Sequence, residues 1–176
     1  MAASLAQSRL AGILAAAWLA AACILLPGVG HAQLDKVRAT MAALIEETHR
    51  LGTPRIKGAY PVGGKSAPGL YFGRTRMNNS FDVVDAVAKE RGGVVILFVK
   101  AGNEFVRVAT NVKKSDGSRA VGTVLDPNSP ALAMISKGEA YYGEATILGM
   151  PFFIGCQPIR DRTGNVIGLY YVGSMQ

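Results

Sequence analysis

The residues from Phe105 to Gly173 constrain the fold most strongly, because strand-like runs alternate there with turns marked by glycine. The run FVRVATNV is followed by the pair Asp116-Gly117 and then by RAVGTVL. An Asp-Gly pair between two such runs is a strong signal for a β-hairpin. This part of the chain therefore predicts a sheet with antiparallel pairing.

One helix and two further hairpins complete this half of the chain. Pro130 begins the predicted helix and Gly138 ends it, while Gly149 and Gly164 mark the two later turns. Upstream, the continuous apolar run VVILFVK predicts a central strand. The sum is an α+β domain with a central antiparallel sheet of five to six strands and helices at one side and one end.

The N-terminal part is predicted to begin with a long helix between Leu34 and Leu51, in which apolar residues recur at intervals of three and four. Two arrangements suit it: a seam that makes a homodimer with a second copy, or a helix lying on its own sheet. Between Gly52 and Ser80 the chain is rich in Gly, Pro, Lys and Arg. We expect an irregular functional loop there, or a short strand around residues 69–72.

The first 32 residues have the organisation of an export signal. Arg9 precedes an apolar run over residues 10–26, and small residues lead up to Ala32. We expect cleavage after Ala32, which leaves residues 33–176 as one periplasmic or secreted domain. The alternative is an uncleaved segment, residues 10–26, that anchors the protein in the inner membrane.

Composition and motifs argue against several functions. The net charge is +7, but the Lys and Arg residues are scattered without interleaved aromatic residues, so we expect a solvated surface and no nucleic-acid partner. The sequence AYPVGGKS lacks the first glycine of a phosphate-binding loop, and His49 is the only histidine after Ala32. No nucleophile–base pair or metal-ligand spacing is present, so we expect no enzyme, catalytic residue, metal or cofactor.

Arg107 is the strongest candidate for ligand contact. Simple alternation along the strand places Phe105, Arg107 and Ala109 on one face and Val106, Val108 and Thr110 on the other. An arginine between apolar neighbours on a central strand needs a partner, because an unpaired buried charge is very costly. The partner is either a protein carboxylate, such as that of Glu104, Asp116 or Glu144, or the carboxylate of a ligand.

Aromatic residues could form the apolar wall of a pocket beside Arg107. Tyr141 and Tyr142 stand at the start of one predicted strand, and Phe153 near the start of the next. Core packing is the common role of such residues, but as a group they also have the composition of a small-molecule pocket. Cys156 is the only cysteine after Ala32, and its apolar surroundings predict a packed thiol.

Four segments together resemble one family: FVRVATNV, DGSRAVGT, KGEAYYG and PIRDRTGNVIGLYYVG. They are similar to the single Cache sensor domains of the type-three group, found in bacterial chemoreceptors and as free-standing exported proteins. The resemblance extends back to about Leu34. It implies a PAS-like fold and the binding of small carboxylates or amino acids on the sheet face away from the N-terminal helix, rather than catalysis.

The resemblance also assigns roles to residues. Arg107 and Thr110 match the motif strand of the family, and Tyr141 and Tyr142 match its KGEAYYG segment. Relatives commonly carry Tyr at the positions of Phe153 and Cys156 and Glu at that of Gln157, which implies a drier pocket or a different ligand here. The candidate ligand-binding residues are therefore Phe105, Arg107, Thr110, Tyr141, Tyr142, Phe153 and Cys156.

The expected function is that of a periplasmic sensor domain for a small organic anion or amino acid. Because no output module follows the domain, we expect it to act in signal transduction, such as chemotaxis, through a membrane chemoreceptor or sensor kinase. The alternative is a structural or interaction module that dimerises or docks through the helix between Leu34 and Leu51, without a ligand.

Overall fold

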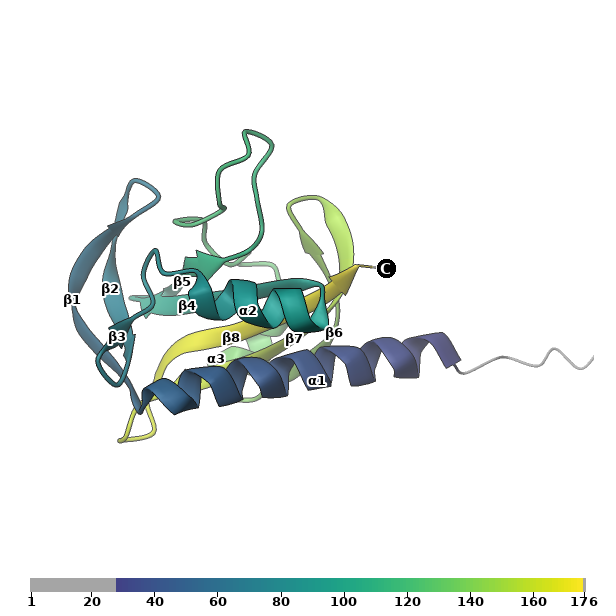
Figure 1. Cartoon of the computed structure of the whole chain (residues 1–176), viewed down its shortest axis with the longest axis horizontal. Helices are drawn as coiled ribbons and strands as arrows, with labels where there is room; N and C mark the ends of the chain where they lie inside the picture. The colour runs from purple at the N-terminus through teal and green to yellow at the C-terminus, as the bar shows by residue number, and fades with distance from the viewer. Residues whose placement is uncertain (1–27, 176) are drawn as a thin grey trace, which may run out of the picture.

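The computed structural model describes residues 28–175, so the predicted signal run at residues 10–26 lies outside the described residues. Eleven elements follow one another in that part of the chain (Figure 1). The helices are α1 (Gly28–Leu51), α2 (Asp82–Arg91) and α3 (Pro130–Ser136). The strands are β1 (Pro54–Val62), β2 (Lys65–Phe72), β3 (Thr75–Arg76), β4 (Val94–Ala101), β5 (Glu104–Thr110), β6 (Tyr141–Ile147), β7 (Met150–Arg160) and β8 (Val166–Met175).

The central sheet has five strands in the order β5-β4-β8-β7-β6, and every neighbouring pair is antiparallel. Helices α1 and α2 cover one face, where α1 packs on β7 and β8 and α2 packs on β4 and β5. Helix α3 lies against β6 and β7 on the other face. The predicted α+β class, the antiparallel sheet and the long N-terminal helix are therefore confirmed.

Helix α1 lies on its own sheet, which is one of the two arrangements that its sequence allows. Val37, Met41 and Leu44 are buried in the core that this face of the sheet forms. Thr48 is also buried, and its Oγ1 lies 3.2 Å from the hydroxyl of Tyr170 on β8. The apolar spacing of the helix is thus accounted for by contacts within one chain.

The region from Gly52 to Ser80 is not a loop, and that expectation was wrong. It forms a second, three-stranded antiparallel sheet in the order β1-β2-β3, and the short strand expected at residues 69–72 is the end of β2. The frequent Gly and Pro residues of this region favoured the prediction of a loop, because both residue types are uncommon in strands. Buried side chains such as Leu70 and Phe72 hold this sheet to the core. Asn78 joins the segment after β3 to β2, because its Oδ1 accepts a hydrogen bond from the Leu70 N–H at 2.8 Å.

The predicted strand RAVGTVL is also absent as a regular strand, although the turn at Asp116-Gly117 is present. Residues 122–125 instead run irregularly along the outer edge of β5. Gly122 N–H donates to the Arg107 carbonyl, Arg107 N–H to the Thr123 carbonyl and Leu125 N–H to the Phe105 carbonyl, each at 2.9 Å. Strand β5 is therefore an edge strand of the five-stranded sheet, not a central one, and this segment covers its edge.

Candidate ligand-binding site

A β-bulge determines which residues of β5 face the site. Leu97 pairs with Ala109, but the next residue of β4, Phe98, pairs with Arg107, so Val108 is the extra residue. Beyond the bulge the alternation is reversed. Thr110 therefore shares a face with Phe105 and Arg107, whereas Ala109 packs with the α1-side core. The simple alternation expected from the sequence was wrong for these two residues.

Arg107 is buried, with 6% of its surface exposed, and it is the only charged side chain among the described residues that is buried. Its guanidinium carbon lies 5.4 Å from the centre of the Phe98 ring. Its Nε and Nη1 atoms are inaccessible and make no hydrogen bond within the described residues. Burial lowers the pKa of Arg107 to about 10, and the nearby Tyr171 hydroxyl opposes this shift. The side chain is thus a desolvated cation at neutral pH.

The protein carboxylates suggested by the sequence do not neutralise this charge. Asp116 lies 3.4 Å from Lys114, and no ion pair within residues 28–175 joins Arg107 to Glu104 or Glu144. A buried cation without a counter-charge is unusual in a folded protein. The described groups that favour the cation are the Phe98 ring and the nearby Tyr171 hydroxyl.

That space is a cavity of about 410 Å³ between the sheet and two covering segments. Arg107 and Tyr171 reach it from strands β5 and β8. The remaining lining comes from residues 123–126 and 128–130, which lead into α3, and from residues 145–149 around the β6–β7 turn. Burial raises the pKa of Tyr171, so its phenol stays protonated at neutral pH and can donate a hydrogen bond.

Four of the other predicted residues lie on the same face as Arg107 but pack around the cavity rather than line it. Tyr141 pairs with Cys156 across β6 and β7, and both belong to the core beneath α3, as does Phe105. Thr110 is fully buried and its Oγ1 accepts a hydrogen bond from the Val112 N–H at 3.0 Å. The Cys156 thiol is packed, and burial raises its pKa well above the ordinary value.

Tyr142 and Phe153 lie on the opposite face of the sheet, against the α1-side core. Because side chains alternate along a strand, Tyr141 and Tyr142 cannot both face one pocket. The Tyr142 hydroxyl accepts a hydrogen bond from Gln157 Nε2 at 2.7 Å, and Arg38 of α1 lies over its ring. The prediction that Tyr142 and Phe153 lie in one pocket with Arg107 is therefore corrected, because both side chains face α1.

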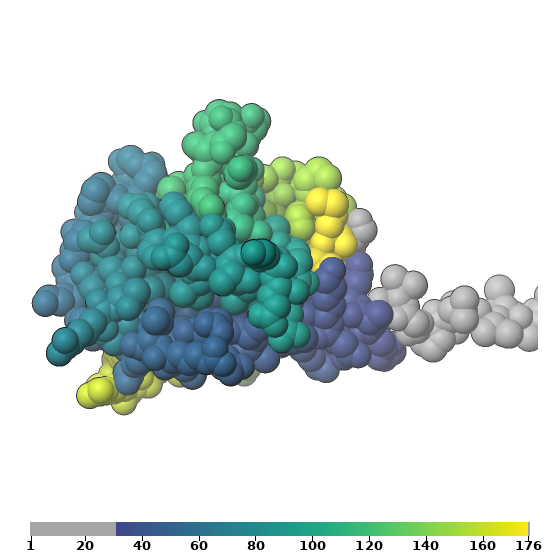
Figure 2. Space-filling model, in the orientation of Figure 1, coloured from purple at the N-terminus to yellow at the C-terminus, as the bar shows by residue number. Residues whose placement is uncertain are grey.

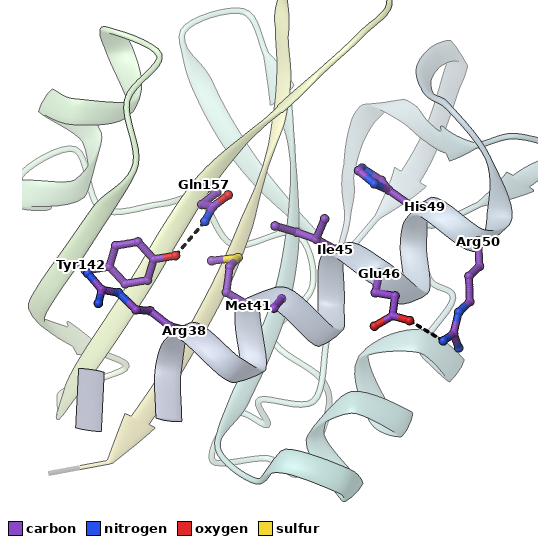
Figure 3. Close-up of a pocket in the computed structure, with 9 residues that line it drawn as sticks. Arg38, Met41, Ile45, Glu46, His49, Arg50, Tyr142 and Gln157 are labelled. Atoms are coloured by element: carbon purple, nitrogen blue, oxygen red, sulfur yellow. Dashed lines mark hydrogen bonds and ion pairs between the residues drawn. The ribbon is translucent and has the colours of Figure 1, made fainter. Parts of the chain in front are cut away.

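The α1 side has a hollow of its own, an open groove of about 860 Å³ (Figure 3). Met41, Ala42 and Ile45 form its apolar part. Four of its polar side chains are paired, because Gln157 donates to Tyr142 and Arg50 contacts Glu46, as the dashed lines show (Figure 3). The groove is larger than the Arg107 cavity, but it contains no buried charge that lacks a partner.

Sequence reasoning missed Phe98, whose ring lies against the Arg107 guanidinium, and Tyr171, which lines the same cavity. Both are on strands that the sequence does predict, in VIGLYYVG and VVILFVK. Their position beside Arg107 follows only from the strand order, since β4, which carries Phe98, lies between β5 and β8. The covering residues Asp126 and Asn128 could not be found either, because they belong to an irregular segment.

These features define a class of protein, a PAS-like α+β domain with a ligand-sized cavity on the sheet face opposite the N-terminal helix. The model of the Cache 3/Cache 2 fusion domain matches residues 35–176, and the chain belongs to this family. Cache domains are extracellular or periplasmic sensor domains for small molecules. No curated protein matches the chain.

Two further observations concern the described residues. None of the helices within residues 28–175 is both long and apolar enough to cross a membrane. The same residues contain no cluster of three or more His, Cys, Asp or Glu side chains with the geometry of a metal site.

Proposed function

We propose that this protein is an exported, non-enzymatic sensor domain that binds a small organic anion, a carboxylate or an amino acid, in the Arg107 cavity. The observation that carries the proposal is the buried guanidinium, whose Nε and Nη1 lack hydrogen-bond partners at the wall of a cavity. A carboxylate bound there would accept hydrogen bonds from the planar fork of the arginine and neutralise its charge.

The size and chemistry of the cavity support this proposal. Its volume of about 410 Å³ lies within the usual range for small-molecule pockets. The protonated Tyr171 phenol would provide a second donor for the anion. Asp126 lines the same cavity and would offer a carboxylate to the ammonium group of an amino acid. A carboxylate without an amine would make no ion pair with Asp126. Comparing the binding of matched ligands with and without an amine therefore distinguishes an amino-acid site from a carboxylate site.

We also propose the domain organisation that the sequence predicts, with cleavage after Ala32 and a mature domain at residues 33–176. The exported domain would bind a membrane chemoreceptor or sensor kinase and signal to it whether the ligand is bound. The intact mass of the protein recovered from the periplasm tests the cleavage. A mass that includes residues 1–32 would support the alternative, in which residues 10–26 anchor the protein in the inner membrane.

The groove along α1 favours a second candidate function, that of an interaction module. A second copy or a receptor segment could lie against Met41, Ala42 and Ile45, using the helix between Leu34 and Leu51. Sedimentation of the purified protein over a range of concentrations, with Ala42→Glu for comparison, tests the homodimer. A dimer lost in the variant would support this function, whereas a monomer at every concentration would exclude the homodimer.

A thermal-shift screen against small organic acids and amino acids tests the main proposal. A ligand at about 100 times its dissociation constant adds roughly 2.7 kcal/mol, which is several degrees for a domain of this size. We expect Arg107→Ala to remove the shift. Arg38→Ala, which removes an exposed arginine on the α1 side, is the matched control and should keep it. An unchanged shift in Arg107→Ala would exclude this site.

A further inference from the structure

The three-stranded sheet has an unusual charge composition. Between residues 52 and 81 the sequence contains five basic residues and no Asp or Glu. The five are Arg55, Lys57, Lys65, Arg74 and Arg76. The whole chain has a net charge of +7. This stretch therefore carries a net charge of +5 on one small sheet, which forms the end of the molecule farthest from the described start of α1 (Figures 1 and 2).

Two tyrosines order part of this charge into a row across the sheet. Arg55 of β1 pairs with Tyr71 of β2, and Tyr71 pairs with Arg76 of β3, so the three side chains share one face. Arg55 lies over the Tyr71 ring at 4.7 Å, and Arg76 lies over the Tyr60 ring at 4.3 Å. The two tyrosine hydroxyls are 2.7 Å apart. This arrangement corrects the expectation of scattered basic residues without interleaved aromatic residues, because Tyr60 and Tyr71 alternate with these cations along the chain.

The remaining cations border this row, and together they make what we call the cationic face: Arg55, Lys57, Tyr60, Lys65, Tyr71, Arg74 and Arg76. The hydrogen bond with Tyr71 lowers the pKa of Tyr60, and the nearby Arg76 and Lys57 lower it further. Lys57, Lys65 and Arg74 are exposed. None of the five cations forms an ion pair with another part of the chain within residues 28–175. The charge is thus presented to the surroundings.

The face also lacks the features of a site for a protein or a small molecule. Ile56 is the one exposed large apolar residue of the three strands, and it pairs with Leu70, whose side chain faces the core, so it does not belong to this face. Protein interfaces are depleted in lysine and need a buried apolar centre. A hollow at Arg55 lies at the margin of the face, beside Asp161.

A membrane surface needs neither a pocket nor an apolar centre. Clusters of about 4–8 Lys and Arg residues bind anionic lipid surfaces through charge alone, and tyrosines suit the level of the headgroups. A guanidinium stacked on an aromatic ring keeps N–H groups available for phosphate oxygens, although Arg55 Nε already donates to the Gly73 carbonyl at 3.0 Å. Because Cache domains are extracellular or periplasmic, such a surface adjoins them. We propose that the cationic face docks this protein on an anionic phospholipid membrane.

Vesicle co-sedimentation of the purified protein tests the proposal. We expect binding to phosphatidylcholine vesicles that contain phosphatidylglycerol, weaker binding to pure phosphatidylcholine, and a loss of the difference at high salt. The comparison between the two vesicles removes any contribution of uncharged apolar contacts. Each cation near an anionic surface strengthens binding about fivefold. The triple variant Lys57→Gln, Lys65→Gln, Arg74→Gln should therefore weaken binding by roughly 100-fold.

A matched triple variant controls for total charge. Lys89→Gln, Lys113→Gln and Lys137→Gln also remove three exposed cations, from α2, the 112–120 hairpin and the end of α3, and should leave vesicle binding nearly unchanged. Circular dichroism and the melting temperature establish that both variants fold. An equal loss in the two triple variants would overturn the proposal, as would equal binding to both vesicles. Binding to soluble polyglutamate without binding to vesicles would assign the face to an acidic protein instead.

Discussion

At the scale of single residues, Arg107 differs from the other cations of the described residues because it is buried and has no carboxylate partner there. Burial lowers the pKa of Arg107 from the ordinary value of an exposed arginine to about 10 in the folded protein. The folded state therefore binds this proton less tightly than the unfolded chain does. The cost to stability is present in full at neutral pH, and it diminishes only as the pH rises above about 10.

This leads to a prediction for Arg107→Met, which keeps the volume and the apolar stem of the side chain. Without ligand at pH 7, the free energy of unfolding should not fall, and it should rise by up to about 1–3 kcal/mol, since a desolvated charge is removed and only its contact with Phe98 is lost. Urea unfolding measures the change. A fall of about 3–5 kcal/mol would instead reveal an internal partner for the arginine.

At the scale of elements, the sequence predicted strands well where apolar residues alternate or run continuously, and poorly where one residue changes the register. The strand β4 and the hairpin of β7 and β8 follow directly from VVILFVK and from the Thr163-Gly164-Asn165 turn. The bulge at Val108 has no local signal, because it arises from the pairing between β4 and β5. It is nevertheless the reason why Thr110 and Arg107 share a face.

The contact between the β1–β2 turn and the segment beside β5 supports a prediction of its own. Gly63 and Gly122 lie against each other with positive φ angles of 56° and 79°. A Cβ atom on Gly63 would lie 2.2 Å from the Val121 carbonyl oxygen, whereas a Cβ on Gly64 would meet nothing within 4 Å. Both Gly63→Ala and Gly64→Ala strain the backbone, by about 1 kcal/mol. The clash should make Gly63→Ala the more destabilising by a further 1–3 kcal/mol or so.

Thermal and urea unfolding of these two variants measure that difference. Because residues 123–126 line the cavity, Gly63→Ala should also weaken ligand binding, while Gly64→Ala should not. Equal melting temperatures for the two variants would mean that the turn and the segment do not press against each other in solution.

At the scale of the whole molecule, the sequence could predict the fold class and one residue of the cavity, but not how the candidate residues divide between the two faces of the sheet. That division depends on where α1 lies. Helix α1 covers the face with Tyr142 and Phe153, and the cavity with Arg107 and Tyr171 lies on the other face. The lining of residues 123–130 could not be predicted, because irregular segments have no periodicity to read.

The positions of α1 and the cationic face also limit how the protein can meet a membrane. Helix α1 has 24 residues and is therefore about 36 Å long. Its described start and the three-stranded sheet lie at opposite ends of the domain (Figure 1). A membrane bound at the cationic face would therefore lie at the end of the domain opposite to the described start of α1.

The cavity and the cationic face should act independently, because no residue of the face lines the cavity. We expect Arg107→Met to retain full vesicle binding, and the variant with Lys57, Lys65 and Arg74 replaced by Gln to retain the full thermal shift with ligand. In the combined variant the two effects should add within about 0.5 kcal/mol. Vesicle titrations of each variant, with and without ligand, measure whether the two effects add.

A coupling larger than that would contradict independence and would also indicate its route. The contact of Gly63 with Val121 and Gly122 joins the β1–β2 turn, which carries Lys65, to the segment that bonds the backbone of Arg107. A ligand that orders this segment would then alter the cationic face through one contact. Gly63→Ala should remove such a coupling, whereas Gly64→Ala should leave it intact. A coupling that survives in both variants would have to be transmitted through the core instead.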